Sequence, residues 1–398
     1  MNNLLNFKSF FKFLSKNKAY TAIDVFGLSV SLMFVILIAV YTVQELSTDN
    51  FQKDGDRIYI LANEGSAGTA LPIAYRLQNR YPEIEKVCPM VLENIGNFKV
   101  QYGDKKFSAE RACVDSTFFN FFSFPLLQGE PETALRDQYN AVISKSFALK
   151  MFGQDDPMGK SIRISDSTNV IVSGVMADIR KSVVPYLDIV IRVERAHEFN
   201  GSISMANDGN AGATVAFLML NKGATLDDKI PDILSYFKET FWLYKHEFCK
   251  EVRIIPLSEL YFTHFDYSSL EQGDRSFVLL LLSVGMLILI FAVFNYINLT
   301  VAQAGQRAKE MATRRLLGST RGELFSRLIM ESTLLTFISF IIGALMAWVA
   351  VPFANQLLAT KIYLADAFTP IWIGGTICVL VLIGLLSGLL PAVLISSA

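Results

Sequence analysis

The chain has 398 residues, of which 52% are hydrophobic, and its mean hydropathy of +0.37 is high for a soluble globular protein. Its net charge is only −1, but this average hides a strong segregation of basic and acidic residues along the chain. The composition therefore argues against a soluble protein and for a membrane protein, and we expect no nucleic acid among its partners.

Four stretches without a charged residue account for the hydropathy: residues 25–44, 276–306, 332–360 and 367–398. A helix needs about 20 residues to cross a hydrocarbon core of ~30 Å, and every stretch is at least that long. Because lipid offers no partner for backbone N–H and C=O groups, the stretches are predicted to be helices. The predicted fold class is a membrane protein with four transmembrane α-helices and a large α+β extracytoplasmic domain between helices 1 and 2.

The predicted organisation follows from these stretches. In chain order it comprises a cytosolic amphipathic helix (1–19), transmembrane helix 1 (20–45), the extracytoplasmic domain (46–274), transmembrane helix 2 (275–303), a cytosolic loop and helix (304–330), transmembrane helix 3 (331–358), a short outer loop (359–370) and transmembrane helix 4 (371–395).

The distribution of lysine and arginine predicts the orientation. Residues 1–19 carry four lysines and no acid, and residues 307–331 carry six Lys/Arg against three Glu. Residues 45–275 carry 25 Lys/Arg against 32 Asp/Glu, a net charge of −7. Since cytoplasmic segments are enriched in Lys and Arg, the N-terminus and the 307–331 loop are predicted to be cytosolic and the large domain outside. A cleaved signal peptide is disfavoured, because the first apolar run is too long and no Ala-x-Ala-like site follows it.

At the N-terminus, residues 4–16 have the pattern of an amphipathic helix. Leu4, Phe7 and four further apolar residues share one face, and Lys8, Lys12 and Lys16 line the other. This arrangement suits a helix lying among lipid headgroups. The alternative is a topology signal without a structural role.

In the outer domain, short alternating or β-branched runs predict strands at 161–165, 169–175, 189–193, 213–220 and 252–255. Helical periodicity occurs at 70–81, 144–152 and 227–250. The two kinds of element do not alternate regularly, which favours an α+β fold. The Gly/Ser/Asn-rich segment 201–212 is predicted to be a mobile loop or a junction between lobes.

The cytosolic loop is predicted to be a helix, a break and a second helix. Gly318 ends the first helix, and Thr320 with Glu323 forms a Thr-x-x-Glu capping box that begins the second. The second helix continues into the third span. A compact helical loop of this kind transmits a push better than an unstructured one.

No motif supports catalysis in this chain. Residues 153–161 resemble a phosphate loop, but five residues separate Gly153 from Gly159 where four are required, and two acids lie between them. His197, His246 and His264 lack the spacing of a zinc site. We expect no catalytic, cofactor-binding or metal residue, no cofactor, and nucleotide hydrolysis only in a separate subunit.

The cysteines and the spans complete the expectations from the residues. Cys88, Cys113 and Cys249 would lie outside, where a Cys88–Cys113 disulfide is an open alternative.

The spans contain none of the ionisable residues that mark an ion pathway, so a substrate channel is not supported. Their glycines are expected to allow close helix packing: Gly285, Gly343, Gly374, Gly375, Gly384 and Gly388.

Several motifs taken together resemble the MacB/FtsX-like permeases of bacterial ABC transporters, especially a branch common in Bacteroidetes. The motifs are ELSTDNF at 45–51 with DRIY at 56–59, FFNFFSF at 118–124, ALKMFG at 148–153 with DPMGK at 156–160, VSGVMAD at 172–178, and NYINL at 295–299 with the loop that follows. The resemblance covers nearly the whole chain. It assigns residues 46–274 to a MacB-like periplasmic core domain.

The resemblance implies a permease subunit in the bacterial inner membrane that passes ATP-driven motion of a separate cytosolic ATPase to its outer domain, to export or release a substrate. It assigns the contact with the ATPase to Arg307, Lys309, Glu310, Arg314, Arg315 and Gly318. The chain departs from the family at Met311-Ala312, where Ile-Gly is usual, and in lacking a basic tail after Ala398. It corresponds to one unit where many members carry two, so the chain is either a half-size permease or a truncated one. A second permease copy or a homologous half is expected as partner.

A second hypothesis from another class is a membrane-anchored sensor or regulator whose outer domain binds a ligand or controls an extracytoplasmic enzyme. It requires the cytosolic loop to recruit a signalling partner, because about 25 residues cannot fold into a kinase or cyclase. The transported substrate is left open by the sequence.

Overall fold

The structure is a computed structural model that describes residues 18–92, 98–165, 167–302, 313, 316, 320–358, 360–364 and 370–397. The chain divides into two compact units, one made of Met1–Leu46 with Arg275–Ala398 and the other of Ser47–Asp274. We call them the helical unit and the outer unit. The amphipathic helix predicted at 4–16 lies outside the described residues.

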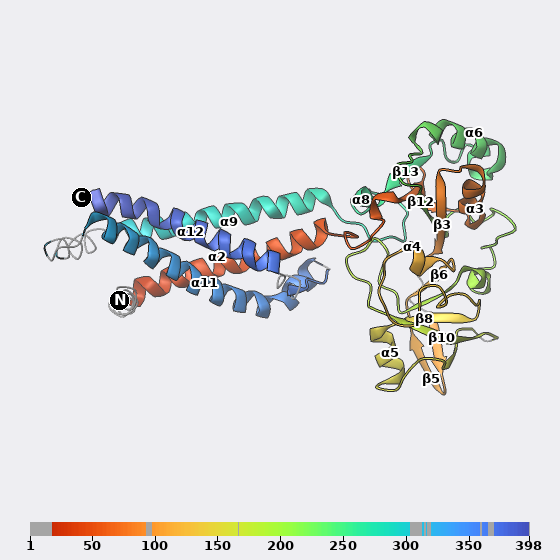
Figure 1. The fold of residues 1–398 in the computed structure, drawn as a ribbon, viewed down its shortest axis with the longest axis horizontal. Helices are drawn as coiled ribbons and strands as arrows, with labels where there is room; N and C mark the ends of the chain where they lie inside the picture. The colour runs from red at the N-terminus through yellow and green to blue at the C-terminus, as the bar shows by residue number, and fades with distance from the viewer. Residues whose placement is uncertain are drawn as a thin grey trace. The chain divides into compact units, whose positions relative to one another are not determined.

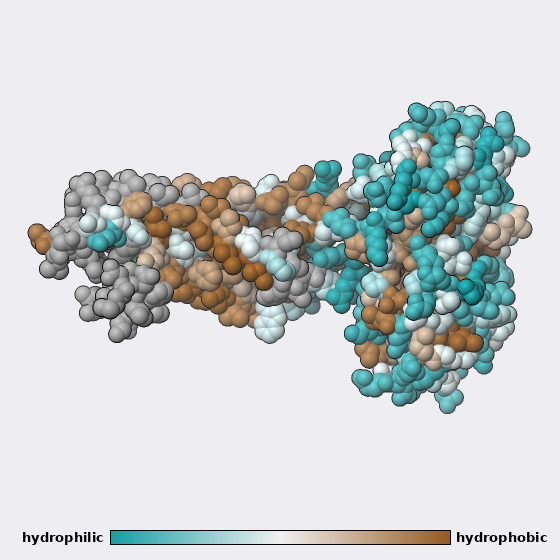
Figure 2. Space-filling model, viewed as in Figure 1, coloured by the Kyte–Doolittle hydropathy of each residue, from teal (hydrophilic) through white to brown (hydrophobic). Residues whose placement is uncertain are grey.

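The helical unit contains four long helices that run side by side (Figure 1): α2 (Lys18–Leu46), α9 (Arg275–Ala302), α11 (Arg321–Leu358) and α12 (Pro370–Ser397). In three of them a segment is long and apolar enough to cross a membrane: Ala22–Leu46, Arg275–Asn295 and Ile329–Leu358. Helix α12 has 28 residues without a charge and a shorter apolar core at Trp372–Leu385. Their described surface is mostly hydrophobic, whereas that of the outer unit is mostly hydrophilic (Figure 2). The predicted fold class is confirmed.

Three of the expected glycines lie at close helix contacts. A Cβ atom at Gly343 would lie 2.8 Å from the carbonyl oxygen of Ser29 on α2, and one at Gly384 would lie 2.7 Å from Oγ1 of Thr333. At Gly285 it would lie 3.1 Å from Ile38. At Gly343 and Gly384 only glycine therefore lets the helices approach so closely, whereas at Gly285 the contact is with a side chain and is tight.

The packing prediction was wrong at Gly374 and Gly375. A Cβ atom at either position would have nothing within 4 Å among the described residues, because both glycines lie on an open face of α12. For Gly388 close packing stays a prediction.

The outer unit is built on one mixed sheet with the strand order β13-β1-β12-β3-β6-β11-β8-β10-β9-β4-β5, to which β2 adds at β12 and β7 at β10. Neighbouring strands are antiparallel except in the pairs β8–β10 and β6–β11. The strands are β1 (Ile58–Ala62), β2 (Gly68–Thr69), β3 (Ile84–Val91), β4 (Lys99–Tyr102), β5 (Lys105–Ser108), β6 (Arg111–Val114), β7 (Leu126–Gln128), β8 (Asn140–Ser144), β9 (Ser161–Arg163), β10 (Asn169–Met176), β11 (Ile189–Arg192), β12 (Thr214–Leu220) and β13 (Arg253–Pro256).

Nine shorter helical segments accompany the sheet in the described part of the outer unit: η1 (Gly55–Arg57), α3 (Leu71–Arg80), α4 (Phe118–Phe121), α5 (Lys145–Phe152), η2 (Val193–Glu198), η3 (Asp227–Lys229), α6 (Ile230–Thr240), α7 (Trp242–Lys245) and α8 (Leu257–Leu260). The five predicted strands are β9 to β13, and the helices predicted at 70–81 and 144–152 are α3 and α5. Each is found within two residues of its predicted ends.

The single helix predicted at 227–250 was wrong. The chain there forms η3, α6 and α7, and the break falls at Phe241, whose backbone is extended (φ −114°, ψ 115°). The Phe241 ring is 1% exposed and packs against Phe237 and Tyr244. Burying three aromatic rings in one cluster outweighs the hydrogen bonds that a continuous helix would add.

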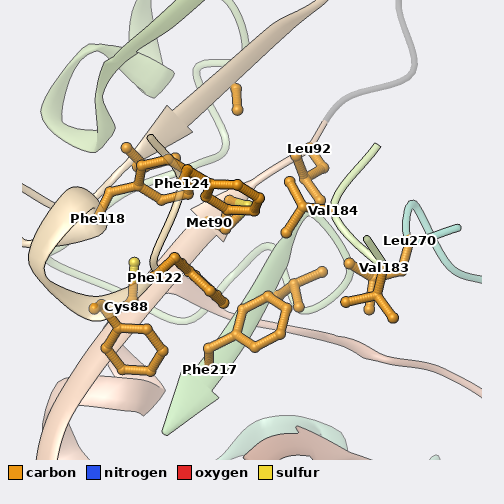
Figure 3. Close-up of a cluster of buried hydrophobic side chains, with 14 of the residues drawn as sticks. Cys88, Met90, Leu92, Phe118, Phe122, Phe124, Val183, Val184, Phe217 and Leu270 are labelled. Atoms are coloured by element: carbon orange, nitrogen blue, oxygen red, sulfur yellow. The ribbon is translucent and has the colours of Figure 1, made fainter. Parts of the chain in front are cut away.

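An aromatic core fills one side of the sheet (Figure 3). The FFNFFSF motif supplies five of its rings, and Phe217 of β12 adds another, with ring centroids of Phe122 and Phe217 5.1 Å apart. Phe118 and Phe124 stack at 5.4 Å. The motif therefore stabilises the domain through packing.

The segment 201–212 joins two other core clusters of the outer unit. Ile203 belongs to the cluster around β8 and β10, and Ala211 packs on the cluster around α3 and α6. Asp208 holds the segment in place, since its carboxylate lies 3.1 Å from Arg76 and its carbonyl accepts a 2.7 Å hydrogen bond from the Trp242 indole. The structure agrees with the lobe-junction alternative.

We predict that Gly343→Ala lowers the thermal stability of the detergent-solubilised protein, by about 1–3 kcal/mol, because the added methyl forces α2 and α11 apart. Gly374→Ala is the matched control: its methyl meets open space, and alanine favours a helix by about 1 kcal/mol over glycine. Thermal unfolding followed by circular dichroism measures both. Equal shifts for the two variants would contradict the packing account.

Candidate functional site

The six residues assigned to ATPase contact lie outside the described residues: Arg307, Lys309, Glu310, Arg314, Arg315 and Gly318. Their roles therefore stay predictions. The description resumes continuously at Thr320, at the start of α11.

The predicted capping box at this point is confirmed. The Thr320 hydroxyl accepts a hydrogen bond from the Glu323 backbone N–H at 3.3 Å, and the Glu323 carboxylate accepts one from the Thr320 N–H at 3.0 Å. These bonds satisfy amides that a helix start leaves unpaired. They fix the first turn of a helix of 38 residues, roughly 57 Å long at 1.5 Å per residue.

Helix α11 links the end of the loop to the spanning segment without interruption. Its apolar span begins at Ile329, so eight helical residues from Arg321 precede it. Inside the span, α11 is hydrogen-bonded to α12: the Ser332 hydroxyl donates a 2.9 Å hydrogen bond to the carbonyl of Gly384.

Where the chain leaves α2 and enters the outer unit, Asp49 is the main attachment. We call residues 47–53 the first connector. The Asp49 carboxylate is 6% exposed and accepts hydrogen bonds from the Ser182 hydroxyl (2.6 Å), the Val183 N–H (2.8 Å) and the Gln52 side chain (3.3 Å). The Asp49 N–H donates to the Lys181 carbonyl at 2.8 Å. Both the backbone and the side chain of Asp49 are thus held by the loop at 181–183.

Burial dominates the ionisation of Asp49. Desolvation raises the pKa of its carboxyl, and the hydrogen bonds from Ser182, Val183 and Gln52 lower it without cancelling the effect. Because the folded-state pKa lies above the unfolded value of 3.8, Asp49 costs stability as the pH rises through the interval between them. Asp49 is therefore a buried charge that local donors make tolerable.

Gln52 extends the attachment to the aromatic core. Its side-chain oxygen accepts a 2.7 Å hydrogen bond from the Ser123 N–H, and the Ser123 hydroxyl accepts one from the Lys53 N–H at 3.0 Å. Ser123 lies inside the FFNFFSF motif, between the buried rings of Phe122 and Phe124. The first connector is thus bonded to the segment that supplies five rings of the aromatic core.

Sequence reasoning missed this attachment. Asp49 and Ser123 entered only as single letters of family motifs, and Gln52 and Ser182 did not enter at all. Two partners of Asp49, Ser182 and Val183, lie more than 130 positions further along the chain. The only local signal was an acid followed three residues later by a glutamine, directly after a predicted span.

The phosphate-loop-like segment is a pair of turns, in agreement with the sequence analysis. Gly153 ends α5 with a φ of 65°, and Gly159 has a φ of 73°. Lys160 is occupied, with its Nζ 3.6 Å from Asp155 and 4.9 Å from the Phe152 ring centroid. An acid beside the lysine opposes binding of a phosphate.

The described residues offer little else that resembles a ligand site. Within them, no three His, Cys, Asp or Glu side chains are grouped as metal ligands would be. A shallow surface groove of about 400 Å³ is lined by Asp137, Tyr139, Asn140, Ser161, Asn169 and Ile171.

The alternative of a Cys88–Cys113 disulfide is contradicted, because the structure describes all four cysteines and none of them forms a disulfide. Cys88 faces the aromatic core, whereas Cys113 belongs to the cluster around β8 and β10. The two thiols therefore point to opposite sides of the sheet. Burial raises the pKa of the Cys88 thiol well above its ordinary value and also raises that of Cys249.

A bundle of apolar helices joined to a mixed α+β domain defines the class: a multi-pass membrane protein with one large soluble domain. Residues 21–228 match the model of the MacB-like periplasmic core domain, and residues 282–398 match the FtsX-like permease C-terminal model. The chain therefore belongs to the MacB/FtsX-like family of ABC transporter permeases.

Three solved structures are similar to the outer unit. A domain of a protein described as a permease, from Porphyromonas gingivalis, is 22% identical with a TM-score of 0.44, and the match covers 54% of this chain and 94% of that one. The periplasmic region of MacB from Actinobacillus actinomycetemcomitans is 14% identical (TM-score 0.39; 52% and 91% covered). The extracellular domain of the noncanonic ABC-type transporter YknZ from Gram-positive bacteria is 13% identical (TM-score 0.37; 50% and 99% covered). Comparison with curated protein sequences gave no significant match.

We predict that the outer-unit thiols are unreactive in the folded protein. Cys88, Cys113 and Cys249 should react with a maleimide at least ~tenfold more slowly before denaturation than after it, because burial restricts access and disfavours the thiolate. Mass spectrometry of labelled peptides measures this. Loss of free thiol after denaturation without reductant would indicate a disulfide and contradict the structure.

Proposed function

We propose that this permease works by mechanotransmission: a separate cytosolic ATPase moves the 307–331 loop, the helices carry the motion across the bilayer, and the outer domain exports or releases a substrate. The observation that carries the proposal is α11, which begins at a capped turn beside the loop and continues unbroken into a span. The chain itself then hydrolyses no nucleotide and needs no cofactor.

The charge of the loop suits its proposed partner. Residues 307–331 carry six Lys/Arg against three Glu, so the loop fits an acidic groove on the ATPase. Arg307, Lys309, Arg314 and Arg315 would supply the attraction, Glu310 would add a polar contact, and Gly318 would permit the turn before α11.

Close packing of the spans supports motion of the bundle over passage through it. The contacts at Gly285, Gly343 and Gly384 bring neighbouring helices together, and the described spans form one connected set. A substrate would then be handled by the outer domain, on the far side of the membrane from the ATPase. A second permease copy or a homologous half would complete the transporter.

We predict that Arg314→Glu combined with Arg315→Glu weakens ATPase binding at least ~tenfold and removes stimulation of ATP hydrolysis, because two attractive contacts become repulsive. The measurements are co-purification and ATPase activity after reconstitution of the full chain with a candidate cytosolic ATPase subunit. Intact binding and stimulation would show that the docking assignment is wrong.

A matched control is Lys105→Glu with Lys106→Glu. It makes the same change of charge at two exposed neighbours on the β4–β5 hairpin of the outer unit. Binding and stimulation should be unchanged in this variant. A kinase or adaptor that co-purifies in place of an ATPase would favour the sensor hypothesis.

The orientation is tested by single cysteines introduced at Lys150 and Arg314. Lys150 is exposed on the outer unit, so a membrane-impermeant maleimide added outside intact cells should label position 150, and position 314 only after permeabilisation. The buried native thiols of the outer unit leave a low background. Labelling of both positions from one side would overturn the proposed topology.

A further inference from the structure

The chain re-enters the helical unit through residues 270–274, which we call the second connector. The Glu271 N–H donates a 2.8 Å hydrogen bond to the carbonyl of Val183. Leu270 is 7% exposed and lies beside Val183 in the aromatic core cluster (Figure 3). The connector to α9 is therefore attached to the same loop that holds Asp49.

Val183 makes one hydrogen bond to each connector. Its N–H donates to the Asp49 carboxylate of the first connector, and its C=O accepts from Glu271 of the second. We propose that Asp49, Val183 and Glu271 form a joint that binds the two connectors together, so that α2 and α9 act on the outer domain as one. This inference rests on the proposed mechanotransmission and names the residues that pass motion into the domain.

The joint is built to resist separation. Val183 and Val184 are 0% and 1% exposed, so water cannot readily replace a broken hydrogen bond there. The Ser182 hydroxyl accepts from the Val184 N–H at 3.1 Å while it donates to Asp49. Lys181 and Asp49 both adopt positive φ angles, 52° and 59°, which turn the two backbones toward each other.

An aspartate suits this position better than its closest relative. The Asp49 side chain accepts three hydrogen bonds and donates none, so a carboxylate satisfies all three donors. Asparagine has the same size and tolerates positive φ, but one of its two terminal atoms is an NH₂ group, which cannot accept a hydrogen bond. In either orientation of the amide, this group faces a donor: the Val183 N–H, or the Ser182 hydroxyl and the Gln52 amide. Asp49→Asn therefore weakens the joint chemically with little backbone strain.

We predict that Asp49→Asn loosens both connectors. In hydrogen–deuterium exchange on the full chain in lipid nanodiscs, peptides covering 181–184 and 270–273 should both exchange at least ~tenfold faster than in the wild type. The second effect is decisive, because Val183 is hydrogen-bonded both to Asp49 and to Glu271 of the second connector. Faster exchange at 181–184 alone, or at neither, would overturn the joint.

Asp178→Asn is the matched control. Its carboxylate also accepts one backbone N–H and one serine hydroxyl, those of Ser146 at 3.1 and 2.6 Å, but it holds no connector. Exchange at 270–273 should stay at the wild-type rate in this variant. If Asp49→Asn does not fold, Ser182→Ala removes one donor to Asp49 and should raise exchange at both peptides to a smaller degree.

The exchange experiment needs no ATPase, so it separates the joint from the proposed function. In the reconstituted complex, Asp49→Asn should keep wild-type ATPase binding, because the 307–331 loop is unchanged, and lose most nucleotide-driven movement of a spin label in the outer domain. A wild-type chain that binds no ATPase would overturn the proposed function and leave the exchange result standing. Full movement in Asp49→Asn would overturn the mechanical role of the joint.

Discussion

Satisfaction of backbone hydrogen bonds without water is the constraint on which this structure depends. In the spans it requires helices, since only a helix pairs its own N–H and C=O groups within one segment. Where the helices end, the backbone N–H and C=O groups need partners from other parts of the chain. A capping box supplies these partners at the start of α11, and the buried carboxylate of Asp49 supplies one beyond the end of α2.

The two solutions differ because their surroundings differ. Thr320 and Glu323 are exposed, and their reciprocal bonds replace water at little cost. Asp49 lies in an apolar core, where a charge is unfavourable unless several donors surround it. Its bonds to Ser182 and Val183 hold the loop at 181–183 in one arrangement. Stiffness at this point is a direct consequence.

The sequence predicted those features that repeat along the chain or depend on near neighbours. The uncharged runs gave the spans, the apolar alternation gave strands such as β10, and the spacing of Thr320 and Glu323 gave the cap. The helix break at Phe241 was missed, since the aromatic cluster that causes it has the periodicity of a helix. Strand β3 was missed because Pro89 interrupts its pattern, although its neighbours β12 and β6 hold it on both sides.

The candidate site likewise has one part that depends on near neighbours in the sequence and one part that does not. The charges of the 307–331 loop are local, so sequence alone suggests a role for Arg314 and Arg315. The joint is not local: Asp49, Val183 and Glu271 meet only after the sheet has formed. Periodicity cannot reveal a contact between three distant segments, and neither can a motif that ends at residue 59.

A transmission mechanism needs stiffness at both ends of the moving part, and each end of the helical path has it. In the proposed mechanism, the cap at the start of α11 would keep the first turn from unwinding under a force on the loop. At the outer unit, two connectors share one buried residue, so relative movement between them would break a hydrogen bond that water cannot replace. A ligand-binding sensor could work with flexible connectors, because it needs only to be held at the membrane. The bonds made by Val183 therefore favour a domain that is driven over one that is merely tethered.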